Sequence, residues 1–226
     1  MKTDGESVGG WFSRLPEADR AVLEAKGTAR RYQAGTTLFH EGDLSDWVIL
    51  LKRGRAKVSM TTRDGKEVVL AVCPPGELLG ELSAIDSAPR SATTTALDVV
   101  DARIVSGEDF RAFLAASPQA SLSLLRSVAG RLRHADRCRM EFVALDSIGR
   151  VASQLVELAE RFGVPAGGGT TQIDLALTQG DLAGLTGASR EAVGKALHLF
   201  RRHGWIATGR RSLTVIDLDS LRSRAI

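Results

Sequence analysis

The stretch LTQGDLAGLTGASREAVGKALHLFRRHGW, residues 177–205, decides the architecture of the C-terminal part of the chain. Thr178 and Asp181 stand three residues apart, which is the spacing of a capping box, where the two side chains satisfy free N–H groups at a helix start. Gly187 permits a tight turn, and Ser189 can cap the helix that follows it. The stretch therefore predicts two short helices joined by a turn.

The second of these helices has two faces of different chemistry. At about 100° per residue, apolar residues gather on one face, namely Val193, Ala196, Leu197 and Phe200. Long polar side chains gather on the other face, namely Glu191, Lys195, His198 and Arg202. A recognition helix needs this arrangement because its first residues enter the DNA major groove, where Arg can bond guanine and Glu can accept from cytosine. The alternative is a helical hairpin used only for packing.

A basic turn follows the second helix. We expect strands at 205–207 and 212–216 on either side of Arg210 and Arg211, which together form a wing whose arginines lie on phosphates. Between residues 188 and 211 there are six basic residues and a single acid, whereas the whole chain carries only +3. Such a local excess of positive charge is typical of a phosphate-binding surface.

The N-terminal half has a different texture. Residues 1–10 look disordered, and a short helix is expected over 15–26 with Pro16 in its first turn. Between residues 28 and 105 the segments are short, β-branched and separated by turns, and four of them read as strands: 47–51, 56–61, 67–72 and 92–96. Asp64 and Gly65 between two such runs are a hairpin signal. This spacing predicts a small antiparallel barrel or jelly roll.

Helices follow the strands. We expect a short helix over 107–116, a long one from Pro118 to about Leu145, a helix from about 148 to 162 capped by Asp146, and a loop over 163–171. Apolar residues of the long helix mostly follow 3-and-4 spacing, namely Leu125, Val128, Leu132, Ala135 and Phe142. That pattern predicts a coiled-coil-like seam with a second copy, loosened where Arg139 falls on it. The alternative is a helix that packs wholly on its own domain.

Composition excludes several classes of protein. A chain of 226 residues with 43% hydrophobic residues has ample material for a core. Two cysteines, Cys73 and Cys138, are too few for a disulfide framework or an iron–sulfur cluster. The sequence has no apolar run of about 20 residues and no secretory signal, so we expect a cytoplasmic protein without a membrane partner. No metal-ligand spacing of histidines and no catalytic constellation is recognisable, so we expect neither a metal site nor an enzyme.

At this point the residues resemble a known family, the cyclic AMP receptor protein and fumarate–nitrate regulator family of bacterial transcription regulators. The resemblance runs from about Leu15 to Leu221, and its most specific part is 177–195. It implies contacts with DNA phosphates and bases, for which the candidate residues are Thr178, Gln179, Ser189, Arg190, Glu191, Lys195, Arg210 and Arg211. Two positions depart from the family pattern: Lys195 replaces the more frequent Arg, and Gly180 stands where Glu or Arg is common.

A second part of the resemblance, residues 75–82 and 88–92, is similar to the phosphate-binding cassette of cyclic-nucleotide domains. The implied ligand-binding residues there are Gly80, Glu81, Leu82, Arg90 and Ser91. A glycine turn lets backbone N–H groups approach a phosphate at a helix start, Arg90 neutralises the phosphate, Ser91 adds a donor and Glu81 accepts from a ribose hydroxyl. The alternative is an empty turn closed by a Glu–Arg ion pair.

The base-reading part of the cassette departs from the family. In cyclic AMP receptors a Thr-Ser or Thr-Asn pair on the long helix contacts adenine, and the matching positions here are Ala135 and Asp136. Ala135 cannot form a side-chain hydrogen bond, and an ionised Asp136 only accepts. Asp136 could accept from the amino group of adenine or from the N1–H and amino group of guanine. The resemblance implies cyclic AMP as the leading candidate effector, and the changed base-reading positions leave cyclic GMP as the other nucleotide. No further cofactor is expected.

Together these observations predict an α+β chain in three parts: a cyclic-nucleotide-binding β-roll over 11–116, a dimerisation helix over 117–145, and a winged helix-turn-helix DNA-binding domain over 146–226. The expected function is a homodimeric regulator gated by a cyclic nucleotide, and the resemblance implies a palindromic double-stranded DNA site and contact with RNA polymerase. Two alternatives stay open. One is a regulator of the same family that needs no nucleotide or answers another ligand, such as a cyclic dinucleotide. The other is a cyclic-nucleotide-binding regulatory subunit of an enzyme.

Overall fold

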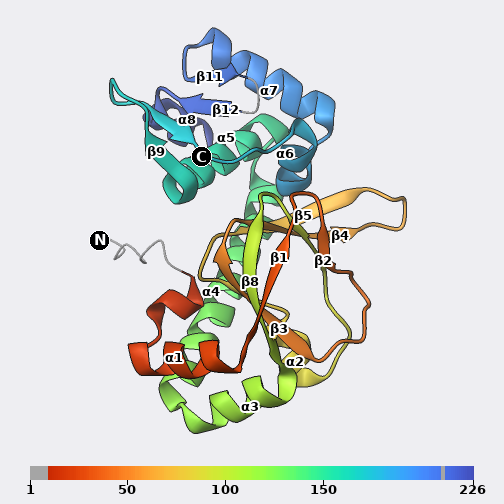
Figure 1. Cartoon of the computed structure of the whole chain (residues 1–226). Coiled ribbons are helices and arrows are strands. Elements are labelled where there is room, and N and C mark those ends of the chain that lie inside the picture. The colour runs from red at the N-terminus through yellow and green to blue at the C-terminus, as the bar shows by residue number, and fades with distance from the viewer. Residues whose placement is uncertain (1–9, 210–211) are drawn as a thin grey trace. The chain divides into compact units, whose positions relative to one another are not determined.

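The computed structural model describes residues 10–209 and 212–226 (Figure 1). The disorder expected for the N-terminus falls almost entirely outside these residues, as do both wing arginines. The chain divides into two compact units, one made of residues up to 61 with 69–133, and one made of 134–226 together with 62–68. The division falls within a long helix, and each unit has its own core.

Two antiparallel sheets form the first unit, each with four strands. One has the order β1-β8-β3-β6 and the other β2-β7-β4-β5. Their bounds are β1 (Thr28–Tyr32), β2 (Thr37–Phe39), β3 (Trp47–Arg53), β4 (Ala56–Thr61), β5 (Glu67–Cys73), β6 (Leu78–Leu79), β7 (Thr93–Ala96) and β8 (Val100–Ser106). This is the β-roll expected from the short, turn-bounded segments, with more strands than the four named from the sequence.

Strand β3 carries a continuous apolar run because both of its faces are covered. Side chains alternate across a strand, so Val48 and Leu50 join one core while Ile49 and Leu51 join the other. The first core also contains residues of the flanking helices, among them Trp11, Leu23, Phe110, Phe113, Ala120 and Leu124. The second core fills the space between the two sheets with Tyr32, Leu38, Phe39, Ala56, Leu79, Ala96, Val100 and Ala102.

The helices of this unit are a 3₁₀ turn (Trp11–Arg14), α1 (Glu17–Lys26), α2 (Glu81–Asp86), α3 (Gly107–Ala116) and the beginning of α4 (Pro118–Ala144). Helix α1 starts two residues later than expected. Pro16 is its N-cap, with an extended ψ of 150°, and is not a residue of its first turn. Leu15 is also extended, with ψ of 149°, because a residue that precedes proline is disfavoured in the helical region.

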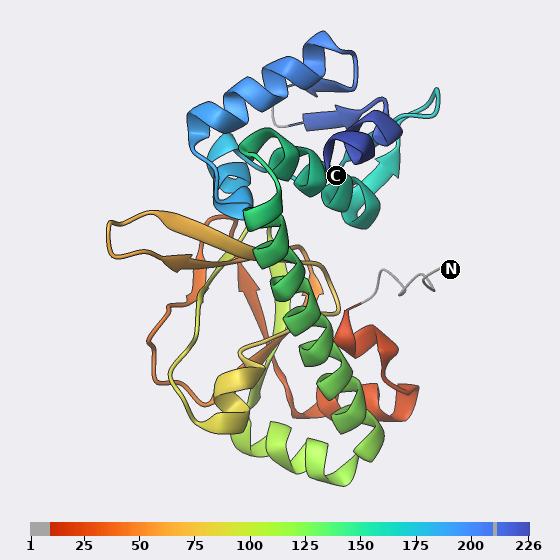
Figure 2. The ribbon, with the colours of Figure 1, turned by 180° about the vertical axis from the view of Figure 1, so that it is seen from behind.

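Helix α4 runs unbroken through the long apolar pattern (Figure 2). Ala120 and Leu124 are buried against the first core. Leu125 and Leu132, by contrast, are 65% and 61% exposed within this single chain. Among the described residues no helix has both the length and the apolar character needed to cross a membrane.

The second unit combines helices with a small sheet of order β11-β12-β10-β9. Its elements are α5 (Ser147–Phe162), β9 (Gly163–Pro165), β10 (Thr171–Ile173), α6 (Gln179–Thr186), α7 (Arg190–Arg202), β11 (Ile206–Gly209), β12 (Ser212–Val215) and α8 (Leu218–Arg224). The expected loop over 163–171 is correct only for residues 166–170, which form a turn. Strands β9 and β10 on either side of it pair as a hairpin, and β10 also pairs with wing strand β12, with Thr171 opposite Val215. The first wing strand also begins one residue later than expected, at Ile206.

These two units have the α+β architecture expected from the sequence, with a β-roll, a long helix and a winged helix-turn-helix. The division into three parts at residues 116/117 and 145/146 stays a prediction.

Candidate nucleotide-binding cassette and DNA-binding surface

The cassette turn connects β6 to α2 through Gly80. This residue has φ of +79°, a left-handed conformation that favours glycine. A Cβ at this position would collide with the guanidinium of Arg90. Both the backbone angle and the space therefore require glycine.

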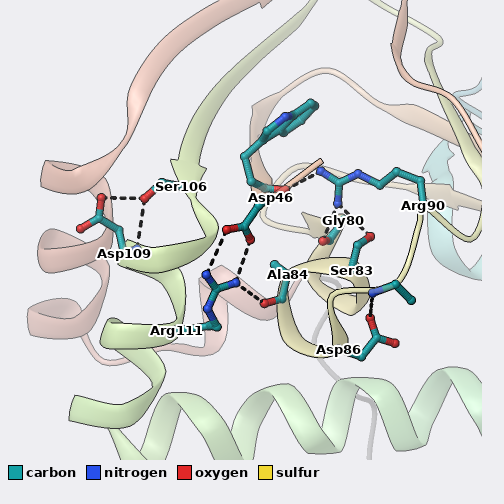
Figure 3. A network of polar contacts seen from close by, with 11 residues as sticks. Asp46, Gly80, Ser83, Ala84, Asp86, Arg90, Ser106, Asp109 and Arg111 are labelled. Atoms are coloured by element: carbon teal, nitrogen blue, oxygen red, sulfur yellow. Dashed lines mark hydrogen bonds and ion pairs between the residues drawn. The ribbon is translucent and has the colours of Figure 1, made fainter. Parts of the chain in front are cut away.

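Arg90 is the central cation of the cassette and is only 2% exposed. Its guanidinium donates to the carbonyl oxygen of Gly80 at 2.6 Å, to Ser83 Oγ at 3.2 Å and to the carbonyl oxygen of Trp47 at 2.5 Å (Figure 3). It also lies over the rings of Phe39 and Trp47, at 4.5 and 4.7 Å from their centres. Its Nε is buried without a partner among the described residues.

All three of these acceptors are neutral. Burial lowers the pKa of Arg90, and the charges of Glu81, Asp43 and Asp46 partly oppose that effect. The guanidinium nevertheless stays protonated, as arginine does in proteins. Within residues 10–209 and 212–226, no carboxylate lies within ion-pair distance of Arg90. A buried cation without a direct counterion favours an anion as its partner.

A second arginine braces the helix that follows the turn. Arg111 of α3 donates to both carboxylate oxygens of Asp46, at 2.7 and 3.0 Å, and to the carbonyl oxygen of Ala84 in α2 at 2.8 Å (Figure 3). This bidentate pair lowers the pKa of Asp46, chiefly through the hydrogen bond from Arg111. The brace fixes α2 against α3 and the residues just before β3.

Glu81 is buried and pairs with the long helix. Its Oε1 accepts from the guanidinium of Arg131 in α4 at 2.6 Å, and its side chain is only 3% exposed whereas that of Arg131 is 51% exposed. Burial lowers the pKa of Arg131, but the charge of Glu81 and its hydrogen bond, together with Cys73 and Glu77, raise the pKa above its usual value. Glu81 therefore pairs with Arg131, and the Glu–Arg pair that would close an empty turn through Arg90 does not form.

These side chains surround a cavity of about 60 Å³. All five cassette residues chosen from the sequence line it, namely Gly80, Glu81, Leu82, Arg90 and Ser91. Sequence reasoning missed the other lining residues: Phe39, Val58, Leu79, Ser83, Ala92, Thr94 and Arg131. Ala135 and Asp136 are exposed on α4, are grouped with the second unit and do not line the cavity.

The sequence held a signal for only some of the missed residues. Ser83 lies three residues after Gly80, and Arg131 is a basic residue one helical turn before Ala135. Thr94 and Val58 belong to β7 and β4 and stand opposite each other in the sheet. A pairing of that kind appears only once the strands have found their register.

In the second unit, both helices of the helix-turn-helix have the caps expected from the sequence. Thr178 Oγ1 accepts from the N–H of Asp181 at 3.1 Å, and Asp181 accepts from the N–H of Thr178 at 2.9 Å, which closes the capping box of α6. Gly187 ends α6 with φ of +61°. Ser189 Oγ then accepts from the N–H of Ala192 at 3.1 Å and caps α7.

Helix α7 turns one face inward and one outward. Val193, Ala196, Leu197 and Phe200 are buried. Glu191, Lys195, His198 and Arg202 are exposed, as are Thr178, Gln179, Ser189 and Arg190. In the part of the chain that the structure describes, no carboxylate forms an ion pair with Arg190 or Lys195. The polar face of α7 is therefore open to a ligand with negative charge.

Several contacts brace the DNA-binding helices. Arg150 of α5 donates to the carbonyl oxygen of Thr186 at 2.9 Å and to that of Leu145 at 2.8 Å, which holds the end of α6. Trp205 stacks on Phe200 with ring centres 5.6 Å apart, and thereby anchors the start of the wing to α7. The wing residues Arg210 and Arg211 lie outside the described residues.

Two family models match the parts of the chain that contain the two candidate sites. The model of the cyclic nucleotide-binding domain family matches residues 29–117, and that of the Crp-like helix-turn-helix domain matches residues 149–224. The first match contains the cavity-lining cassette, and the second contains α6, α7 and the wing strands.

Curated relatives match over most of their length. The chain is 37% identical to a CRP-like cAMP-activated global transcriptional regulator of Mycobacterium tuberculosis over 216 residues, 96% of each chain. It is 30% identical to the cyclic AMP receptor protein of Thermus thermophilus over 87% of each chain. The solved c-di-GMP responsive global regulator CLP of Xanthomonas campestris has a TM-score of 0.79 at 22% identity and covers 88% of this chain and 99% of that one, which shows a shared fold. The chain therefore belongs to the cyclic AMP receptor protein and fumarate–nitrate regulator family of DNA-binding transcription regulators.

Proposed function

We propose that this regulator is a homodimer whose binding to DNA is gated by a cyclic nucleotide, with cyclic AMP as the leading candidate, held in the cassette around Arg90. The observation that carries the proposal is the buried Arg90 guanidinium, which has only neutral acceptors and an unpartnered Nε. A phosphate would supply the missing negative charge through charge-assisted hydrogen bonds.

The surrounding residues suit the rest of such a ligand. Glu81 uses one carboxylate oxygen for Arg131, and a carboxylate has room for further donors, so it can also accept from a ribose hydroxyl. Leu82 and Ser91 line the cavity and are both exposed, and we expect the ligand to extend past them.

The long helix supports a dimer. Leu125 and Leu132 expose large apolar side chains one heptad apart on α4, which is the spacing of a seam between two helices. In a symmetric dimer the two copies of α7 would enter successive major grooves about 34 Å apart on a palindromic site. The ligand would act by binding the DNA-competent state more tightly than the other state. Contact with RNA polymerase, which the family resemblance implies, stays a prediction.

One observation favours a second candidate, a regulator of the same family that needs no cyclic nucleotide. Three hydrogen bonds already hold the guanidinium of Arg90 in place. The base-reading positions Ala135 and Asp136 also lack the hydroxyl and amide groups of cyclic AMP receptors. An enzyme regulatory subunit would need no helix-turn-helix, so the match over 149–224 argues against it.

Calorimetry of the full chain with cyclic AMP and cyclic GMP tests the proposal. We expect saturable binding of at least one of them, no binding of adenosine, which lacks the phosphate, and loss of binding in Arg90→Gln. Arg30→Gln, an exposed arginine of β1, is the matched control and should bind as the wild type does. If neither nucleotide binds in calorimetry, the result would instead support the nucleotide-independent regulator.

A second experiment determines which DNA sequences the protein binds. DNA sequences are selected from a random pool by the full chain, with and without the nucleotide that binds in calorimetry. We expect a palindromic sequence to be enriched, and enriched more strongly with the nucleotide present. Equal enrichment in both conditions would contradict nucleotide gating while leaving DNA binding intact.

A further inference from the structure

Thr94 of β7 lies in the wall of the cassette cavity. In the sheet it stands between two other residues that line the cavity, with Phe39 of β2 on one side and Val58 of β4 on the other. Side chains alternate across a strand, so Ala96 shares the face of Thr94, and it is buried too. The hydroxyl of Thr94 therefore lies among apolar neighbours.

This hydroxyl has no partner in the part of the chain that the structure describes. Thr94 is 1% exposed, and its Oγ1 makes no hydrogen bond within residues 10–209 and 212–226. A buried hydroxyl without a partner lowers stability, whereas valine has the same branched shape, suits a strand and carries no such cost. By contrast, Oγ1 of the neighbouring Thr93 accepts from the N–H of Glu41 at 3.0 Å. The Thr94 hydroxyl therefore points to a partner from outside the chain.

A second donor without a partner belongs to the same cavity. Arg90 Nε makes no hydrogen bond among the described residues, and the guanidinium of Arg90 lies 4.5 Å from the ring centre of Phe39. Phe39 is the sheet neighbour of Thr94, and paired residues on one face of a sheet have Cβ atoms about 4.5–5.5 Å apart. Arg90 and Thr94 both line the cavity. Two neighbouring donors without acceptors, one of them charged, suit a single anionic group.

We propose that Thr94 is a further ligand-binding residue of the cassette: its hydroxyl donates to an exocyclic phosphate oxygen of the cyclic nucleotide that Arg90 holds. Rotation about χ1 exchanges the positions of the hydroxyl and methyl groups of threonine, so the hydroxyl can turn toward a phosphate while the strand stays in place. The inference rests on the proposed function. It adds a contact that does not depend on the base, in a cavity that the base-reading positions Ala135 and Asp136 do not line.

The experiment measures binding of cyclic AMP and cyclic GMP to the full chain by calorimetry, with the variants Thr94→Val and Thr94→Ser. Valine removes the hydroxyl and keeps the branched shape, whereas serine keeps the hydroxyl. Thr95→Val is the matched control, because Thr95 is half-buried and lies on the opposite face of the same strand. Thermal unfolding of every variant is measured without nucleotide. Binding is also measured with analogues in which sulfur replaces one or the other exocyclic phosphate oxygen.

We expect Thr94→Val to weaken the binding of both nucleotides by the same factor, roughly 10- to 150-fold, the range for a hydrogen bond to a charged group. Thr94→Ser should keep most of the wild-type affinity, and Thr95→Val should keep all of it. Without nucleotide, Thr94→Val should unfold at or above the wild-type temperature. Sulfur at one of the two phosphate oxygens should weaken binding to the wild type more than to Thr94→Val, because the variant has already lost that bond.

Three results would overturn the inference although the wild type binds a nucleotide, and they would leave the proposed function intact. One is wild-type affinity in Thr94→Val, and another is a loss of affinity that serine does not restore, which would assign the loss to packing. The third is an equal effect of sulfur on the wild type and on Thr94→Val, which would place the contact away from the phosphate. If the wild type binds neither nucleotide, the proposed function fails and this inference fails with it.

Discussion

Glu81 and Arg131 join the cassette to the long helix through a hydrogen bond of 2.6 Å between Oε1 and the guanidinium. The carboxylate is buried and the arginine is half-exposed. Any ligand that binds Glu81 therefore acts on a residue already attached to α4. This contact couples the cassette to the helix on which the proposed dimer forms.

Removing the arginine should cost more stability than removing both partners. In Arg131→Met the buried carboxylate of Glu81 loses its partner, and we expect a loss of about 1–3 kcal/mol in the free energy of unfolding. The double variant Glu81→Gln with Arg131→Met should recover part of this loss, because no charge is then left buried. Urea unfolding followed by circular dichroism measures the unfolding free energies of the single and double variants. Equal losses in the two variants would contradict a stabilising pair between Glu81 and Arg131.

Removing the hydroxyl of Thr94 should not lower the free energy of unfolding, in contrast to removing the guanidinium of Arg131. Thr94 is 1% exposed, and its Oγ1 has no hydrogen-bond partner among the described residues. Thr94→Val removes a buried polar group without breaking a bond, so stability should stay equal or rise by up to about 1 kcal/mol. Thr186→Val is the control, since Thr186 Oγ1 donates to the carbonyl oxygen of Leu182 at 2.8 Å and its loss should cost about 1 kcal/mol. A destabilised Thr94→Val would show that the hydroxyl has a partner.

Asp146 predicts a pH dependence. The N–H of Gly149 donates to it at 2.7 Å and Arg224 lies 2.6 Å away, and these contacts, the backbone bond first, lower the pKa of Asp146. Because the pKa of Asp146 is lower in the folded state than in the unfolded state, its ionised carboxylate stabilises the fold. This contribution is fully present above the unfolded pKa of about 3.9 and is lost as the pH falls through the folded pKa. The difference in unfolding free energy between wild type and Asp146→Asn should therefore shrink below about pH 4. A difference that is constant between pH 7 and pH 2 would contradict this.

Replacing Lys195 by arginine should increase the base specificity of DNA binding. It is exposed on the polar face of α7, and lysine offers a point charge where arginine offers a two-toothed fork. Lys195→Arg should sharpen base preference at one base pair by about 1 kcal/mol, as measured with a set of singly substituted DNA sites. Lys195→Gln should weaken all sites alike and reduce the salt dependence of binding by about one phosphate contact. If Lys195→Arg leaves the base preference unchanged, position 195 does not contact a base edge.

Leu132 tests the dimer. A charge at this exposed apolar position of α4 would be buried in a paired seam, so Leu132→Glu should convert the dimer to a monomer and weaken binding to a palindromic site. Arg133→Glu, next to it and also exposed, is the control and should remain dimeric. Light scattering after size-exclusion chromatography measures the molecular mass. A Leu132→Glu variant that stays dimeric would show that Leu132 does not lie in the dimer interface.

Local patterns proved reliable where the cause was itself local. The capping box of Thr178 and Asp181, the cap at Ser189 and the turn at Gly187 all appear in the structure as expected, because each involves residues within a few positions of one another. The helix over Gly107–Ala116 also has the expected bounds. Its N-cap, Ser106, accepts from the N–H of Asp109.

Patterns failed where the partner was distant in sequence. Thr171–Ile173 became a strand because it pairs with Ser212–Val215 about forty residues later, and a stretch rich in glycine gives no local sign of this. Arg131 escaped the candidate list for the same reason, since its partner Glu81 is fifty residues away.

Residue types and their spacing along the chain were enough to predict two features of this protein: a cassette with glycine and arginine, and a helix with one apolar and one polar face. These depend on residue type and short-range spacing, which a linear chain carries in full. Tertiary structure alone decided the partners: neutral acceptors around Arg90, Arg131 beside Glu81, and Thr94 between Phe39 and Val58. Such choices depend on which strands and helices pack together, because burial and close approach are properties of the packed chain.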